Sequence, residues 1–148
     1  MSKDDGDIVA TNGPEPIEGA LIAGEFRIRA SLMGVDLGWW KDDGATEYWI
    51  SATHNRAEAI IWTLVASGGH TYLKKSTNNY LSYRSNKVIY YEGLKIRQWT
   101  TAAAWKRDGD FLRCVNNGNL VGYDGGMFYC NNQNIVKVDF VPVKPDAS

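Results

Sequence analysis

The sequence predicts an all-β protein, and three observations support this prediction. From Leu21 onward, short runs rich in Ile, Val, Tyr, Trp and Thr alternate between apolar and polar residues with a period of two. Clusters of Gly, Asn and Asp interrupt these runs about once in every ten residues, and helical periodicity is almost absent. Related blocks of sequence also recur along the chain at a spacing of about 40 residues, which is typical of repeat architectures.

The first two strands of each block show the clearest repetition. Each block opens with a strand-like run, and the three openings are EFRIRA at Glu25, HTYLKK at His70 and GDFLRC at Gly109. The second run in each block has an aromatic residue near its end: DLGWWK with Trp40, NYLSYR with Tyr83 and NLVGYD with Tyr123. Because these aromatics are about 40 residues apart, the blocks are predicted to be copies of one structural unit.

Two further runs complete each block. The third strands are predicted in EYWISA, KVIYYE and GMFYCN, and the fourth in IIWTLVA, within IRQWTTAAAWK and in KVDFVPV. The fourth strand of the middle block is the least well defined. Its three alanines favour a helical turn, and Trp99 and Trp105 offer two different registers.

Three copies of a four-strand unit predict a β-trefoil, in which a six-strand barrel is capped by three hairpins. One such unit leaves its hydrophobic face open, whereas three units around a pseudo-threefold axis leave no long unpaired edge. The predicted domain covers residues 21–148 as a single unit, and a β-sandwich is the alternative fold. Residues 1–20 contain few large apolar side chains and are predicted to form a flexible acidic tail.

Large apolar residues at recurring positions are predicted to fill the barrel. This prediction covers Phe26, Leu64, Tyr72, Phe111 and Phe140. Trp62 is also expected in the core, whereas Tyr48 or Trp49 is expected at the surface. An indole N–H needs a partner when it is buried, and tryptophan often lies where one edge of its ring is wet.

The charge pattern excludes several classes of partner. The 16 Lys and Arg residues nearly balance the 17 Asp and Glu residues, for a formal net charge of -1. Because no basic run is interleaved with aromatics, we expect no nucleic-acid partner. No apolar run reaches the roughly 18 residues of a membrane span, so membrane insertion is not expected. Without a recognisable signal peptide, a cytoplasmic location is predicted, with export by a non-standard route left open.

No grouping of reactive side chains indicates catalysis. His54 and His70 lie in separate breaks between strands, and neither belongs to a pattern with metal-ligand spacing. The G-x-S-x-G motif is absent, and Cys114 and Cys130 are expected to be reduced thiols. We therefore expect no enzymatic activity, no metal and no cofactor.

The segment WKDDGATEYW combines the residue types that sugar binding requires. Its candidate residues are Trp40, Asp42, Asp43, Thr46, Glu47, Tyr48 and Trp49. An aromatic face packs against the apolar side of a sugar ring, and fixed polar groups pair with the sugar hydroxyls. The alternative interpretation is a polar hairpin whose tryptophans point inward.

Two longer stretches resemble the agglutinin domain of the amaranthin-like plant lectins. They are YWISATHNRAEAIIWTLVASG, from Tyr48 to Gly68, and NNYLSYRSNKVIYYEGLKIRQW, from Asn78 to Trp99. The resemblance implies a β-trefoil that binds galactose-type or N-acetylgalactosamine-type glycans without a metal. It also implies a sugar site on the segment before the Tyr-Trp-Ile step, where the family normally has Asn-His and this chain has Thr46 and Glu47.

Other trefoil functions remain open from the sequence. The stretch NLVGYDGGMFYCNNQNIVKVDFVPV also resembles a repeat of the fascin-type trefoils, which bundle actin filaments. A trefoil protease inhibitor is a third alternative and would need one exposed, extended loop. A lectin is preferred, with glycans or glycoproteins as partners. A homodimer is a further expectation, because joined sites raise avidity.

Overall fold

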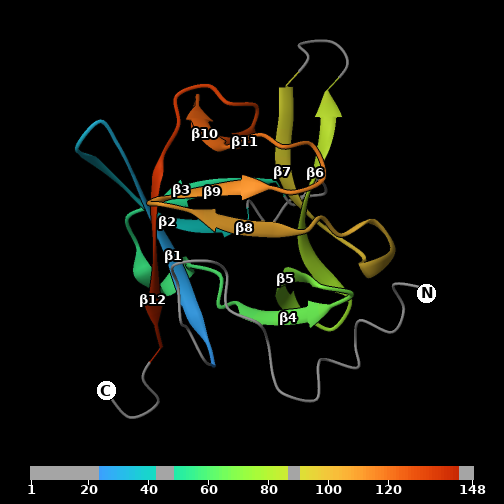
Figure 1. Ribbon diagram of the computed structural model, residues 1–148. Coiled ribbons are helices and arrows are strands. Elements are labelled where there is room, and N and C mark those ends of the chain that lie inside the picture. Colours follow the sequence, from blue (N-terminus) through green and yellow to red (C-terminus); the bar gives the residue numbers. More distant parts are fainter. Residues whose placement is uncertain (1–23, 43–48, 87–90, 144–148) are drawn as a thin grey trace.

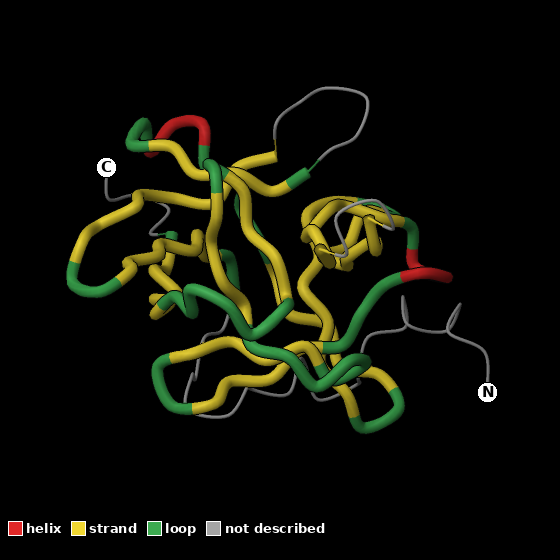
Figure 2. Tube along the Cα trace, turned by 90° about the horizontal axis from the view of Figure 1, so that it is seen from above, coloured by secondary structure: helices red, strands yellow, loops and turns green. Residues whose placement is uncertain are grey.

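The computed structural model describes residues 24–42, 49–86 and 91–143, so the predicted tail at residues 1–20 lies outside the described part. Within these ranges the protein is all-β, as predicted, with one 12-stranded antiparallel sheet and two single-turn 3-10 helices (Figure 1). The elements are β1 (Phe26–Leu32), β2 (Val35–Asp42), β3 (Ile50–Thr53), η2 (Arg56–Glu58), β4 (Thr63–Ser67), β5 (His70–Ser76), β6 (Asn79–Asn86), β7 (Tyr91–Arg97), η3 (Trp99–Thr101), β8 (Trp105–Asp108), β9 (Phe111–Cys114), β10 (Val121–Asp124), β11 (Met127–Cys130) and β12 (Lys137–Pro142). Figure 2 shows from above how strands predominate over the two 3-10 helices.

Six of the strands contact one another in a ring. β1 pairs with β12, and its first residue, Phe26, exchanges backbone hydrogen bonds of 3.0 and 2.8 Å with Trp62, directly before β4. β4 pairs with β5, β5 with β8, and β8 with β9. The amide of Val138 in β12 donates to the carbonyl of Asp110, directly before β9 (2.9 Å). These contacts return to β12, so the sheet curls into a nearly closed barrel.

The other six strands form three hairpins, β2–β3, β6–β7 and β10–β11, which meet through their second strands. The three contacts have the same offset. When the three second strands are aligned, a residue of one strand pairs with the residue two positions after its equivalent in the next strand. The three pairs are Trp49 with Lys95, Gly93 with Tyr129 and Met127 with Ser51. β3, β7 and β11 therefore form a three-sided cap with one strand from each block.

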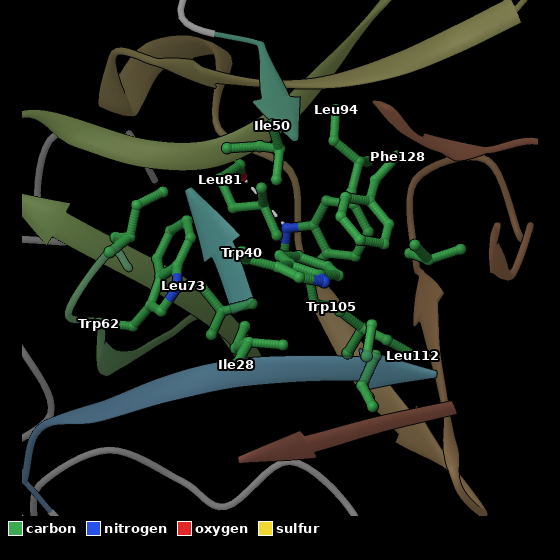
Figure 3. Packing of buried hydrophobic residues seen from close by; sticks show 14 of the residues in the cluster. Ile28, Trp40, Ile50, Trp62, Leu73, Leu81, Leu94, Trp105, Leu112 and Phe128 are labelled. Atoms are coloured by element: carbon green, nitrogen blue, oxygen red, sulfur yellow. Dashed lines mark hydrogen bonds between the residues drawn. The ribbon is translucent and has the colours of Figure 1, made fainter. Parts of the chain in front are cut away.

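The hydrophobic core fills the barrel and the inner side of this cap (Figure 3). Ile28, Leu73 and Leu112 are fully buried in the first strand of each block. Each lies two residues after the contact between its strand and a neighbouring barrel strand. Trp62 is fully buried as well, which confirms its predicted place in the core.

The predicted core residues have different outcomes. Those that lie in the main cluster are Phe26, Leu64 and Phe140. Tyr72 is also buried, but it belongs to a second cluster around Trp99 and not to the barrel. The prediction for Phe111 is wrong, because Leu112 points inward and Phe111 stays partly exposed. Strand register decides which of two neighbouring apolar residues faces the core, and a shift of one residue exchanges them.

The structure shows where the third and fourth strands of the middle block lie. The third strand, predicted in KVIYYE, is β7, and residues 87–90 of that stretch lie outside the described part of the chain. Trp99 lies in η3, whereas Trp105 begins β8 and is buried. The Trp105 indole Nε1 donates to the carbonyl of Leu81 at 3.1 Å, which fixes the register of the fourth strand.

Two further findings concern the cysteines and the search for membrane-spanning helices. Cys114 and Cys130 are both buried and carry free thiols. In the described ranges, no helix is long and apolar enough to cross a bilayer.

Candidate functional site

The predicted binding segment spans the end of β2 and the approach to β3. Asp43, Thr46, Glu47 and Tyr48 lie in residues 43–48, outside the part of the chain that the structure describes. Trp40, Asp42 and Trp49 are described, and the structure gives each of them a different environment. The site must therefore be built from these three residues and their neighbours.

Trp40 is a core residue. Its side chain is fully buried, and its ring lies 4.9 Å from the ring of Phe128, centre to centre (Figure 3). In the β2–β3 hairpin, Trp40 pairs with Ala52 on the side that faces the barrel. A ring without exposed surface offers no face to a sugar, so Trp40 does not belong to a surface site in this structure.

Asp42 lies at the last position of β2 and joins the first block to the second. Its Oδ2 accepts a hydrogen bond from Nζ of Lys75 in β5, and its side chain is only 14% exposed. Because a partly buried carboxylate is stabilised by a nearby cation, this pair holds the end of the hairpin against the barrel. Asp42 therefore has a structural partner at the edge of the candidate site.

Trp49 is different, because this residue stays partly exposed. All six tryptophans lie in the described ranges, and the other five are buried: Trp39, Trp40, Trp62, Trp99 and Trp105. Nζ of Lys95 lies 5.0 Å from the centre of the Trp49 ring, within the range of a cation–π interaction. Trp49 thus remains partly exposed, and in the sequence it directly follows residues 43–48, which include the predicted site residues Asp43, Thr46, Glu47 and Tyr48.

Gly93 sets the position of this ring. A Cβ atom placed on Gly93 would lie only 2.8 Å from Cζ3 of Trp49 and 3.6 Å from Cε2 of Tyr129. Both rings therefore rest against the bare backbone of β7, and a side chain there would displace the Trp49 ring. Such close approach is a common reason for a glycine within a strand.

Several side chains on the outward side of the cap form one patch. Ile50, Leu94 and Phe128 point into the core and are fully buried. Successive side chains in a strand point to opposite faces, so their neighbours point outward. We name this outward set the cap patch, and its members are Trp49, Ser51, Lys95, Met127 and Tyr129, all of them partly exposed. Ser51 Oγ is buried without a hydrogen-bond partner among the described residues.

Sequence reasoning found Trp49 but missed Gly93, Lys95 and Tyr129. The cap contacts align WIS, GLK and MFY in the third strands, and this alignment comes from the strand pairing and not from the sequence pattern. The predicted alignment used KVIYYE for the middle block and so placed the wrong residues opposite Trp49. The contacts between blocks follow only from the correct register.

Comparison with protein-family models, with curated proteins and with solved structures finds no match for this chain. The resemblance to the amaranthin-like agglutinins therefore stays a prediction. Within the described ranges, no three His, Cys, Asp or Glu side chains lie together in a way that could hold a metal ion.

Proposed function

We propose that this protein is a β-trefoil lectin that binds galactose-type or N-acetylgalactosamine-type glycans without a metal. The trefoil part rests on the ring of six strands, on the three-sided cap and on a repeated backbone hydrogen bond. In each block, an amide near the fourth strand donates to a carbonyl in the second strand. The three bonds are Ile60 to Trp40 (3.0 Å), Ala103 to Leu81 (3.4 Å) and Val136 to Val121 (3.1 Å).

One observation carries the carbohydrate-binding part: among six tryptophans, Trp49 alone is not buried, and it follows the polar segment at residues 43–48. The ring is held in place by Gly93 and Lys95. A rigid aromatic platform loses little conformational entropy when a ligand stacks on it. Asp43, Thr46 and Glu47 supply hydroxyl and carboxylate groups for pairing with sugar hydroxyls.

A protein-interaction module, such as the fascin-like alternative, is the second candidate. Met127 and Tyr129 are partly exposed members of the cap patch, as Trp49 is, and Met and aromatic residues are enriched in protein interfaces. The net charge of -1 gives no strongly basic chain for binding an acidic filament. The protease-inhibitor alternative stays a prediction, since the connections at 43–48 and 87–90 lie outside the described residues.

A glycan array followed by titration tests the proposal. We expect binding to glycans that end in galactose or N-acetylgalactosamine, unchanged by a metal chelator. Trp49→Ala should weaken the strongest of these interactions by about 1 to 3 kcal/mol, by analogy with stacking on other aromatic platforms. Agglutination of cells would require joined sites, so light scattering should then show a dimer or larger oligomer.

Met33→Ala provides the control, because Met33 is 93% exposed in the β1–β2 turn, away from the cap patch. This variant should bind and melt like the wild type. Silence across the array would contradict the lectin proposal, and so would unchanged binding by a correctly folded Trp49→Ala variant.

A further inference from the structure

A hollow lies outside the cap patch, between the middle hairpin and the loop that precedes β8. It has a volume of about 300 Å³ and is lined by Ser82, Tyr83, Arg84, Arg97, Thr101, Ala102, Ala103 and Asn116. This volume is at the lower end of the range for small-molecule sites. The hollow is therefore suited to a ligand the size of one sugar residue.

The back wall of the hollow is held by hydrogen bonds within the protein. Ser82 Oγ donates to the carbonyl of Thr101 at 2.6 Å, so this hydroxyl already has its acceptor. Asn116 Oδ1 accepts from the amide of Ala104 at 2.8 Å, which fixes the orientation of the side-chain amide. The NH₂ group of Asn116, on the other side of the amide carbon, is then the donor that remains.

Two guanidinium groups complete the wall. Arg97 Nη1 donates to the carbonyl of Tyr83 at 3.3 Å, a long bond that uses one of its five N–H donors. Among the described residues, neither Arg84 nor Arg97 forms an ion pair with a carboxylate, and no Asp or Glu lines the hollow. Within the described part of the chain, the hollow thus offers many donors, two positive charges and no negative charge.

The fold does not require arginine at these two positions. The hairpin registers place Tyr83 opposite Leu94 and Tyr123 opposite Phe128, as Asp42 lies opposite Ile50. By this alignment, Arg84 corresponds to Asp43 and Asp124, and Arg97 corresponds to Thr53 and Asn131. The other two blocks build the same hairpin without these cations, so the arginine pair is a property of the middle block alone.

We propose that this hollow is a subsite for an oxyanion group carried on a sugar, either the carboxylate of a sugar acid or a sulfate ester. Arginine presents paired N–H groups in a plane that matches carboxylate and sulfate oxygens, and such charge-assisted hydrogen bonds are stronger than neutral ones. The sugar part of this ligand rests on the proposed lectin function, whereas the oxyanion part rests only on the residues of the hollow. The protein then has two sites, one for a neutral sugar at Trp49 and one for an acidic sugar at Arg97.

Calorimetric titration with galacturonate, galactose 6-sulfate and galactose tests this subsite. We expect at least one of the two acidic sugars to bind, and its binding should weaken as salt increases. Arg97→Gln and Arg84→Gln should each weaken it about tenfold or more. Tight binding of galacturonate alone would identify a carboxylate site, and tight binding of galactose 6-sulfate alone would identify a sulfate site.

Two controls separate this proposal from the lectin proposal. Lys137→Gln removes the positive charge of an exposed side chain in β12 and should change acidic-sugar binding less than twofold, by the weak effect of a distant surface charge. Trp49→Ala should keep the binding of the acidic sugar and lose that of galactose. If galacturonate and galactose 6-sulfate bind no better than galactose, or if both arginine variants bind them normally with unchanged melting, the subsite is overturned while the Trp49 site can still stand.

Discussion

The inner and outer faces of the cap are built from the same three strands but differ in chemistry. On the inner face, each strand contributes one large apolar side chain, and Ile50, Leu94 and Phe128 are all fully buried. On the outer face, the residues that precede these three in the chain are Trp49, Gly93 and Met127. The residues that follow them are Ser51, Lys95 and Tyr129. The inner residues are alike in all three blocks, whereas the outer residues share no common property.

This difference shows which positions the fold constrains. An inner position must exclude water and fill space, so only large apolar groups satisfy it. An outer position must only permit strand pairing, and its side chain is available for other roles. Gly93 is the exception on the outer face, because the ring of Trp49 occupies the space that a side chain would need.

The largest effect is expected on the inner face. Phe128→Ala removes a ring that lies 4.9 Å from Trp40 and 5.0 Å from Tyr123, and it should lower the free energy of unfolding by about 3 to 5 kcal/mol. Met127→Ala, one residue away on the outer face, should cost much less. Urea unfolding of both variants measures the contrast, and equal losses would mean that the two faces are not distinct.

Gly93→Ala should have the next largest effect, although it is a change on the outer face. The added methyl group meets the Trp49 ring, and overpacking of this kind costs about 1 to 3 kcal/mol of stability. The same change in a Trp49→Ala background should cost less, since the ring is gone. A double-mutant cycle by thermal unfolding measures this coupling, and additive costs would show that the ring does not occupy the space above Gly93.

Lys95→Met tests the cation above Trp49. Removing the charge should lower stability by about 0.5 to 1 kcal/mol, the usual size of an exposed cation–π contact. Comparison with the same change in a Trp49→Leu background isolates the contribution of the pair. Should the two backgrounds give the same loss, the ammonium group owes its position to other contacts.

The smallest effect on stability is expected for an ion pair outside the cap. Arg29 donates two hydrogen bonds to Asp36, and these bonds lower the pKa of Asp36 to about 2. A lowered folded-state pKa adds stability above the unfolded value of 3.8, and this stability is lost as the pH falls towards 2. Because Asp36 is well exposed, Asp36→Asn should cost less than about 1 kcal/mol at neutral pH and should flatten the acid side of the stability curve. A steep acid limb that persists in this variant would assign the acid sensitivity to other carboxylates.

The barrel core could be predicted from the sequence more readily than the outer face of the cap. Alternation and the recurring blocks indicate strands, the recurring position of Phe26 predicts a core residue, and Phe26 and Trp62 are both fully buried, as predicted. Phe111 and Leu112 could not be told apart, because both are apolar neighbours and only the pairing register decides between them. The block alignment was also two residues out in the second strands, since Trp40 corresponds to Leu81 and Val121 and not to Tyr83 and Tyr123.

The outer face needed contacts that the sequence does not encode locally. Trp49 was identified from its place beside a polar segment, but its neighbours Lys95 and Tyr129 come from other blocks. Their approach depends on how three hairpins dock, and a local pattern carries no information on that geometry. The sequence does not reveal the arginine pair of the middle hairpin for a different reason: Arg84 lies in β6 and Arg97 in β7, and only the pairing of these two strands brings both into the lining of one hollow.

The most direct test of a sugar site at Trp49 is an NMR titration that follows the six indole N–H signals, each assigned with a Trp→Phe variant. We expect galactose or N-acetylgalactosamine to shift the Trp49 signal in a saturable way, because Trp49 is the one tryptophan of the six that is not buried. The signals of the five buried tryptophans should stay close to their free positions. A Trp49 signal that does not move while another indole responds, or the absence of any change at saturating sugar, would contradict the account.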